Sequence, residues 1–313
     1  MKIKVITSYK PGCWNQYAKK GIESMAEQFP KEIDLVVYAE EPKPECKYER
    51  IQWVDLNTAE PKLNAFKHRH KDDPVANGKL QTKVNGVRRV PELQTLGGAD
   101  KNKESFLWDA VRFSNKVICV VNGLRNSEGY DYVVWIDADT FSFRPIPIAF
   151  FESLLPKDTM VTYLGRENPT LGDGGKYPEC GFVGYNCNHP ETQNFIDDWE
   201  QLYVTDDVFK ILEWHDSYLF WQCVKRIAPN DGVDIGKGAG AKGHHIFVNS
   251  VLGAYIDHMK GKRKVKGKSS KSDLRGGRQE SYWQNVESYD PFGGIKFDPK
   301  QAEDIISKVA KGK

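Results

Sequence analysis

The alternation of strand-like and helix-like segments at the N-terminus restricts the fold more than any other feature of the sequence. Residues 2–8 (KIKVITS) alternate in β-branched residues and predict a first strand. We expect a helix over about residues 17–28, where Lys and Glu occupy the exposed positions, and a second, apolar strand at residues 35–40 (LVVYAE). Two strands joined through a helix run parallel, because the crossover returns the chain to the same end of the sheet. This order predicts an α/β fold with a parallel sheet.

The rest of the chain continues this alternation after one interruption. Residues 56–104 are polar and rich in Lys, His, Asn and Gly, so we expect a long, partly helical and mobile excursion with few apolar clusters. Residues 107–124 carry apolar residues at spacings of three and four, which predicts an amphipathic helix. Further predicted segments are the strands YVVWID, TMVTYLGR and ECGFVGYN, a short helix in PIAFFESLLP, and helices at 189–211 and 215–227.

The composition is that of a globular protein. The chain has 313 residues, 39% hydrophobic and 28% charged, and its net charge of +2 does not single out a nucleic acid or a membrane as a partner. No window holds about 18 consecutive apolar residues, and no apolar leader opens the sequence, so we expect no transmembrane helix and no signal peptide. The six cysteines are irregularly spaced without a C-x-x-C pair, which predicts reduced thiols and a cytoplasmic protein.

The segment YVVWIDADT places two carboxylates, Asp137 and Asp139, at the end of an apolar run. Side chains two residues apart in an extended strand share one face, so these carboxylates would repel each other unless a cation lies between them. Open α/β sheets bind ligands beyond the carboxyl ends of their strands, and Mg²⁺ and its relatives combine protein carboxylates with substrate phosphates. The pair therefore predicts a metal-bound diphosphate. The alternative is an ordinary turn, because Asp is common after a strand.

The segment WIDADTF resembles the D-x-D motif of glycosyltransferases with the GT-A fold. In that group the motif holds a divalent cation on the diphosphate of a nucleotide-sugar, which implies Mn²⁺ or Mg²⁺ as the cofactor. The preceding WDAVRFSNKV resembles the R-x-x-x-K helix of such enzymes, and the spacing lets Arg112 and Lys116 share one helical face and reach phosphate or sugar. Two solvated cations are the alternative. The resemblance implies a GT-A type, Rossmann-like sandwich with a mixed, mainly parallel central sheet.

A second motif, H-x-x-G-x-x-K, lies at residues 258–264. It resembles the C-terminal motif of glycosyltransferase family 8, in which the His is the third metal ligand and the Lys contacts the diphosphate. The resemblance implies His258 as a metal ligand, which suits Mn²⁺, and Lys264 as a phosphate contact. The family continues with Pro-Trp, where this chain has Val-Lys.

Two segments between these motifs resemble the sugar-binding parts of family 8. YPECGFVGYN would line the donor sugar with Gly181 and Asn186. WHDSYLFW would supply Asp216 to the sugar hydroxyls, although the Asp-Gln pair of the family is Asp-Ser here. The aromatic residues Trp214 and Tyr218 either contact the sugar or belong to the core.

Two carboxylates are candidates for a catalytic base. An inverting reaction needs an acidic residue to take the acceptor proton, for which Asp216 is the first candidate and Glu179 the second. A retaining reaction, as in family 8, needs no such base and is slightly favoured. The end of the first strand contacts the nucleotide in this fold, where Tyr9 would stack on uracil or simply pack. The donor-binding residues implied in all are Thr7, Ser8, Tyr9, Arg112, Lys116, Asp137, Ala138, Asp139, Gly181, Asn186, Gly261 and Lys264.

Three other patterns in the sequence resemble known kinds of binding site. A G-x-G-x-x-G match at 238–243 precedes a strand-like IFVNS instead of a helix, so it predicts a flexible loop near the donor and not a dinucleotide site. The stretch 260–278 holds nine Lys and Arg against one acid; beyond the family 8 motif it would be a loop over the donor, an arm for an anionic acceptor such as DNA, or a solvated surface. No familiar zinc spacing fits the remaining candidates, Cys180, Cys187, His189 and His215.

The sequence predicts a metal-dependent glycosyltransferase, a hexosyltransferase that uses a nucleotide-sugar, with UDP-hexose favoured, and an unidentified acceptor. Residues 1–265 would form the catalytic domain and 266–313 a basic segment and tail with a small helix near 299–311. One alternative is a nucleotidyltransferase that makes nucleotide-sugars, although the loop YKPGCWNQY lacks the Gly-rich sequence such enzymes need. The other is a non-catalytic protein that binds nucleic acid or polysaccharide.

Overall fold

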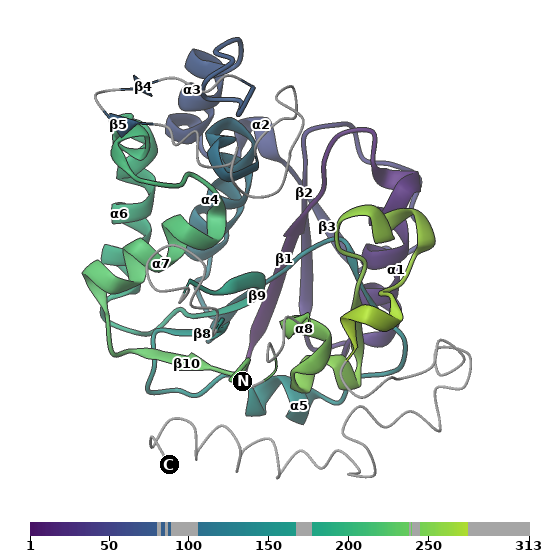
Figure 1. Ribbon diagram of the computed structural model, residues 1–313. Helices are drawn as coiled ribbons and strands as arrows, with labels where there is room; N and C mark the ends of the chain where they lie inside the picture. Colours follow the sequence, from purple (N-terminus) through teal and green to yellow (C-terminus); the bar gives the residue numbers. More distant parts are fainter. Residues whose placement is uncertain are drawn as a thin grey trace.

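A seven-stranded sheet forms the centre of the computed structural model. The structure describes residues 1–79, 83–84, 87–88, 106–166, 177–237, 239 and 245–274. Within the sheet, β9 runs antiparallel to both of its neighbours, and the other pairs are parallel. The predicted α/β fold with a mixed, mainly parallel sheet is confirmed. The strand order is β10 (Gly232–Asp234), β8 (Val161–Leu164), β9 (Glu179–Asn186), β6 (Tyr132–Ile136), β1 (Ile3–Ser8), β2 (Asp34–Ala39) and β3 (Ile51–Asp55) (Figure 1).

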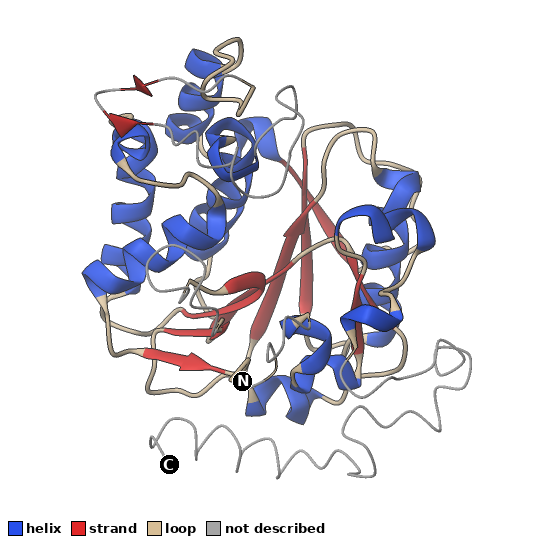
Figure 2. Ribbon diagram, viewed as in Figure 1, coloured by secondary structure: helices blue, strands red, loops and turns tan. Residues whose placement is uncertain are grey.

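Helices cover both faces of this sheet (Figure 2). The side chains of β1 alternate between two apolar cores, because Ile3 and Val5 pack on the α1 side and Ile6 on the α4 side. Both faces of β6 are covered, so all of its residues are buried, which explains its unbroken apolar sequence. The helices are α1 (Lys19–Gln28) and α5 (Ile148–Ser153) on one face, and α4 (Ala110–Arg125), α6 (Thr192–Val204) and α7 (Asp216–Ile227) on the other.

The first part of the excursion predicted for residues 56–104 belongs to the core. It contains α2 (Leu56–Ala59) and α3 (Pro61–His70), and Leu63 and Phe66 are fully buried on the α4 side of the sheet. The expected helical content is confirmed there, but the expectation of few apolar clusters is wrong for residues 56–79. Two short strands, β4 (Lys83–Val84) and β5 (Val87–Arg88), pair antiparallel, and residues 89–105 lie outside the described part of the chain.

A two-stranded antiparallel ribbon brings the C-terminal part of the core to the end of β6. It consists of β7 (Thr140–Ser142) and β11 (Ile256–His258), and His258 pairs with Thr140. The preceding IFVNS, predicted as strand-like, forms the helix α8 (Ile246–Asn249) instead. A short apolar run does not distinguish the two structures by its periodicity. A short π-helix lies at Trp14–Ala18, and 3₁₀ helices lie at Phe106–Trp108, Asp207–Lys210, Val251–Ala254, Gly261–Lys266 and Lys271–Asp273.

The remaining expectations concern membranes, cysteines and the tail. No helix among the described residues has the length and apolar character to cross a membrane. All six cysteines are free thiols, as expected. The predicted helix near 299–311 lies outside the described residues, and the division of the chain at residue 265 stays a prediction.

Candidate metal and donor site

The two aspartates of the D-x-D segment lie in a tight turn and not on an extended strand. Strand β6 ends at Ile136, and the carbonyl of Asp137 accepts hydrogen bonds from the amide (3.0 Å) and the hydroxyl (2.8 Å) of Thr140. The amide of Asp137 donates to the carbonyl of Gly181 at 3.0 Å, which ties the turn to β9. Backbone contacts therefore fix the direction of both aspartates.

Helix α1 supports this turn through a glycine. A Cβ atom at Gly21 would lie 2.2 Å from the carbonyl oxygen of Ala138 and 2.4 Å from that of Thr140. Only a residue without a side chain allows the helix to approach the turn this closely. The sequence analysis did not identify Gly21, because nothing local marks it.

The turn and the ribbon bring together Asp137, Asp139 and His258. The Nε2 atom of His258 lies 3.2 Å from Oδ1 of Asp139 and 3.8 Å from Oδ2 of Asp137. One ligand atom from each of the three residues lies within 4.8 Å of the others, which is close enough for one ion. The predicted proximity of His258 to the acidic pair is confirmed.

The three residues fit a divalent cation. Two carboxylate oxygens and one imidazole nitrogen form a donor set that suits Mn²⁺. The imidazole turns Nε2 towards the carboxylates, while its buried Nδ1 has no hydrogen-bond partner among the described residues. No other group of His, Cys, Asp and Glu side chains in the described residues has this geometry, so the candidate zinc group around Cys180 does not form.

Positive side chains surround the acidic pair. The ammonium of Lys264 lies 3.0 Å from Oδ2 of Asp139 and 4.2 Å from the centre of the Tyr17 ring. Burial raises the pKa of Asp139, but His258 and Lys264 outweigh burial and hold that pKa below its ordinary value. Burial likewise lowers the pKa of His258, and the carboxylate of Asp139 more than reverses this effect. Asp139 is therefore a carboxylate anion in a positive environment.

Lys116 joins the metal-site turn to α7. Its buried ammonium donates to Oδ2 of Asp216 (2.6 Å) and the carbonyl of Cys180 (2.5 Å), and it lies 3.4 Å from Oδ1 of Asp137. Burial lowers the pKa of Lys116, but the two carboxylates raise it above its ordinary value. The ammonium predicted to reach phosphate or sugar is thus bound by protein oxygen atoms.

Both candidate bases are paired with cations. Burial raises the pKa of Asp216, yet Lys116 holds it below its ordinary value. The carboxylate of Glu179 accepts from Arg166 and from Lys260 (2.5 Å), which together hold its pKa well below the ordinary value despite burial. A carboxylate with a lowered pKa is a weak proton acceptor.

Most of the predicted residues line one cleft with a volume of about 820 Å³. This size is in the usual range for ligand sites, about 300–1,000 Å³. The cleft is also lined by Lys67, Asn77 and Lys79, which belong to the excursion. The predicted residues that line it are Ser8, Tyr9, Arg112, Lys116, Asp137, Ala138, Asp139, Glu179, Asp216, His258, Gly261 and Lys264.

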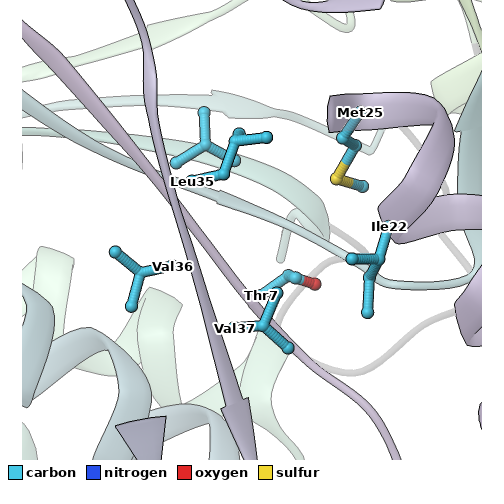
Figure 3. A pocket seen from close by; sticks show the side chains of 7 residues that line it. Thr7, Ile22, Met25, Leu35, Val36 and Val37 are labelled. Atoms are coloured by element: carbon cyan, nitrogen blue, oxygen red, sulfur yellow. The ribbon is translucent and has the colours of Figure 1, made fainter. Parts of the chain in front are cut away.

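Thr7 lies outside this cleft, contrary to the prediction. Its side chain points to the α1 side of the sheet, beside Ile22, where it lines an apolar void of about 10 Å³ (Figure 3). Neighbouring side chains of a strand point to opposite faces, so Thr7 and Ser8 cannot both face the same site. Ser8, the last residue of β1, and Tyr9 both line the cleft, and the Tyr9 ring packs against Trp14 with ring centres 5.7 Å apart.

Asn186 lies at the wrong end of β9 to line the donor sugar. Because β9 is antiparallel to β6, Phe182 pairs with Ile136 near the metal site, whereas Asn186 pairs with Tyr132 at the start of β6. The side-chain Nδ2 of Asn186 donates to the carbonyls of Lys157 and Thr159, both at 3.0 Å. Its side chain therefore holds the loop before β8, at the end of the sheet opposite to the acidic pair.

Gly181 supports His258 and does not line the cleft. A Cβ atom at Gly181 would lie 3.1 Å from Cε1 of His258 and 3.1 Å from Cδ2 of Phe247. Trp214 is core, as its alternative interpretation stated, because it is 1% exposed and donates from Nε1 to the carbonyl of Ile211. Tyr218 is buried as well.

Arg166 and Lys260 are cleft residues that the sequence analysis missed. Lys260 follows the metal-site histidine by two residues, and this spacing was the available signal. Arg166 is the last residue of the segment TMVTYLGR, two residues after β8, and nothing in the sequence connects it with Glu179. The G-x-G-x-x-G segment lies largely outside the described residues.

No protein-family model matches the sequence, and no curated protein matches it either. Among solved structures, the fold is similar to mouse Xyloside xylosyltransferase 1 in its apo form, with 13% identity and a TM-score of 0.43, over 74% of this chain and 83% of that one. It is also similar to the apo structure of the WbbM bifunctional glycosyltransferase, with 11% identity and a TM-score of 0.40, over 75% of this chain and 38% of that one. Likeness at this level carries no argument about activity, which has to come from the site itself.

Proposed function

We propose that this chain is a metal-dependent glycosyltransferase that moves a sugar from a nucleotide-sugar, with UDP-hexose the favoured donor, to an acceptor in the same cleft. The observation that supports this most is the meeting of Asp137 and Asp139 with His258 and Lys264. These residues come from distant parts of the sequence, and they combine a ligand set for a divalent cation with an ammonium group for phosphate. When bound, Mn²⁺ or Mg²⁺ would supply Lewis acidity to the leaving diphosphate.

The protein groups around this site suit a diphosphate. Lys264 would neutralise phosphate charge, and Gly261 would let the backbone turn beside it, because its φ of +61° is strained for other residues. Arg112 is exposed on the cleft wall and would bind the outer part of the donor or the acceptor. Tyr9, which lines the cleft, would contact the nucleotide base.

The pairing of Asp216 and Glu179 with cations supports a retaining reaction. An inverting reaction requires a base that takes the acceptor proton, and both carboxylates have lowered pKa values. We assign Asp216 to hydroxyl groups of the donor sugar. Asp216 lies close to the metal site, because the Lys116 ammonium that it binds also lies 3.4 Å from Oδ1 of Asp137. Glu179 would orient Lys260 and Arg166 at the cleft wall.

The proposal is tested by a thermal-shift screen of nucleotide-sugars with and without Mn²⁺, followed by measurement of donor hydrolysis. Asp137→Asn and Asp139→Asn should each weaken Mn²⁺ binding, measured on the protein without nucleotide, by at least about tenfold, since each removes one charged ligand. Asp158→Asn is the control, because that aspartate is exposed and does not line the cleft. Saturation with a donor at about 100 times its Kd should stabilise the wild type by about 2.7 kcal/mol.

Two results would contradict the proposal. One is donor turnover that persists in EDTA and in both aspartate variants. The other is a screen in which no nucleotide-sugar raises the melting temperature of the wild type, with or without Mn²⁺.

A further inference from the structure

One buried carboxylate next to the metal site has no role in the proposed reaction. Asp257 precedes His258 on β11, and its side chain is 0% exposed. Its Oδ1 accepts the amide of His258 at 2.7 Å, and its Oδ2 accepts the amide of Ser269 at 2.9 Å. A buried carboxylate is unfavourable unless its oxygen atoms are hydrogen-bonded, and here both oxygen atoms have partners.

These two bonds close a loop, residues 259–269, which we call the clasp. At its start the amide of Met259 donates to the carbonyl of Asp139 at 2.7 Å. At its end Ser269 returns to the carboxylate of Asp257. The clasp therefore leaves β11 and comes back to the same strand, and it passes the metal site between these two points. Figure 1 shows the yellow-green C-terminal part of the described chain lying beside α1.

Met259 is buried in the core at the start of the clasp, and polar contacts connect the rest of the clasp to neighbouring elements. Val265, at its tip, is 93% exposed and contributes no burial. Lys20 of α1 donates to the carbonyl of Gly267, and its ammonium lies 3.6 Å from the centre of the Phe141 ring. Arg263 forms an ion pair with Asp273 at 3.0 Å, just beyond the clasp. The contacts of Asp257 connect the two ends.

The clasp carries the lysine that meets the acidic pair. Lys264 reaches Asp139 at 3.0 Å, and the backbone of Asp139 is itself bonded to the first residue of the clasp. A lysine side chain has many rotamers, so its ammonium stays at one carboxylate only if its backbone is fixed. Through Ser269 and the amide of His258, Asp257 supplies that fixation.

We propose that Asp257 is a positioning residue, whose carboxylate closes the clasp and so places Lys264 at Asp139 before a donor binds. The placement of the clasp stands on the structure alone. The consequence for ligand binding rests on the proposed function, because it assigns Lys264 to the diphosphate. Two measurements separate these parts.

The first measurement is hydrogen exchange of backbone amides without metal or nucleotide. Asp257→Asn keeps the size of the side chain but leaves only one acceptor oxygen for two amides. Exchange in residues 259–269 should accelerate at least about tenfold, since one protecting hydrogen bond is lost, while β1 and β6 exchange as in the wild type. Glu200→Gln is the matched control: Glu200 is also buried and bonded to Arg125, but it lies outside the cleft.

The second measurement is the affinity for UDP in the presence of Mn²⁺. Asp257→Asn should weaken it about as much as Lys264→Met, and the double variant should be no weaker than Lys264→Met, because both changes remove the same contact. Lys20→Met loosens the clasp from the exposed surface of α1 without altering the buried carboxylate, and it should show the same non-additivity with Lys264→Met.

Unchanged exchange in the clasp of Asp257→Asn would overturn the proposal. So would additive losses of UDP affinity in either double variant, and so would equal acceleration of clasp exchange by Glu200→Gln. If exchange accelerates as expected while wild-type protein does not bind UDP, the proposed function fails and the closing role of Asp257 stands.

Discussion

Replacing Gly21 by alanine should damage the metal-site turn from the opposite side of α1. The added Cβ would lie 2.2 Å from the carbonyl oxygen of Ala138 and 2.4 Å from that of Thr140, where ordinary contact begins at 3.4 Å. Both opposing atoms belong to the backbone, and they cannot rotate away as the end of a side chain could. Either the helix or the turn has to move by about 1 Å, which is the situation of an overpacked core.

Two opposing effects set the size of the stability loss caused by Gly21→Ala. Alanine favours a helix over glycine by up to about 1 kcal/mol. Overpacking costs about 1–3 kcal/mol, and rigid backbone contacts place Gly21→Ala at the upper end. The net loss should therefore be about 2 kcal/mol, or a fall of about 3 °C in melting temperature for a chain of this size. Because the moving turn carries Asp137 and Asp139, Mn²⁺ affinity should also fall at least about tenfold, equivalent to about 1.4 kcal/mol.

Thermal unfolding and Mn²⁺ titration measure these two effects. Lys19→Ala is the control, because Lys19 belongs to the same helix and is exposed. It should change stability by no more than about 0.5 kcal/mol. A Gly21→Ala protein as stable as Lys19→Ala, with wild-type Mn²⁺ affinity, would refute the argument that close approach of α1 holds the turn.

Two further predictions concern paired charges. Lys116→Met leaves Asp137 and Asp216 close together without their cation. The free energy of unfolding, measured in urea, should therefore fall by about 3 kcal/mol, and adding Asp216→Asn should recover part of this loss. If the double variant recovers nothing, the loss comes from packing alone. Hydrogen bonds from Arg125 hold the pKa of Glu200 below its ordinary 4.5. The folded state thus binds fewer protons than the unfolded state, so stability from this pair is complete above the unfolded pKa and is lost as pH falls through the lower folded pKa. The difference in free energy of unfolding between wild type and Glu200→Gln should become smaller below about pH 4.5. A difference that stays constant from pH 7 to pH 3 would contradict this assignment.

Local patterns predicted those parts of the fold that local physics decides. The strand before Asp137 is buried on both faces, and its unbroken apolar sequence reports this directly. Helix α4 repeats apolar residues every three or four positions because one side of it packs on the sheet. The short run IFVNS was too brief for either periodicity, and it was assigned wrongly.

The site residues were predicted less evenly, because their placement depends on strand direction and long-range pairing. The prediction that Asn186 lines the donor sugar is wrong because β9 runs antiparallel to β6, and sequence alone does not give the direction of a strand within a mixed sheet. The prediction that Thr7 binds the donor is wrong because neighbouring elements decide which face of a strand lines a cleft. His258 reaches the aspartates through a ribbon of two three-residue strands, which no periodicity could reveal; only the resemblance of the H-x-x-G-x-x-K motif suggested it.

Contacts of the protein backbone fix the geometry of the acidic pair. The amide of Asp137 donates a hydrogen bond to the carbonyl of Gly181, and the carbonyl of Asp139 accepts one from the amide of Met259. Gly21 packs closely against the turn. Repulsion between the carboxylates is countered within the chain by lysine and histidine side chains brought from α4, β11 and the clasp. The unfavourable free energy of assembling these charges is therefore balanced during folding. Under the proposed function, a cation or a diphosphate that enters the cleft would not have to order the residues that hold it, and groups fixed in advance bind more tightly than groups that must be ordered on binding.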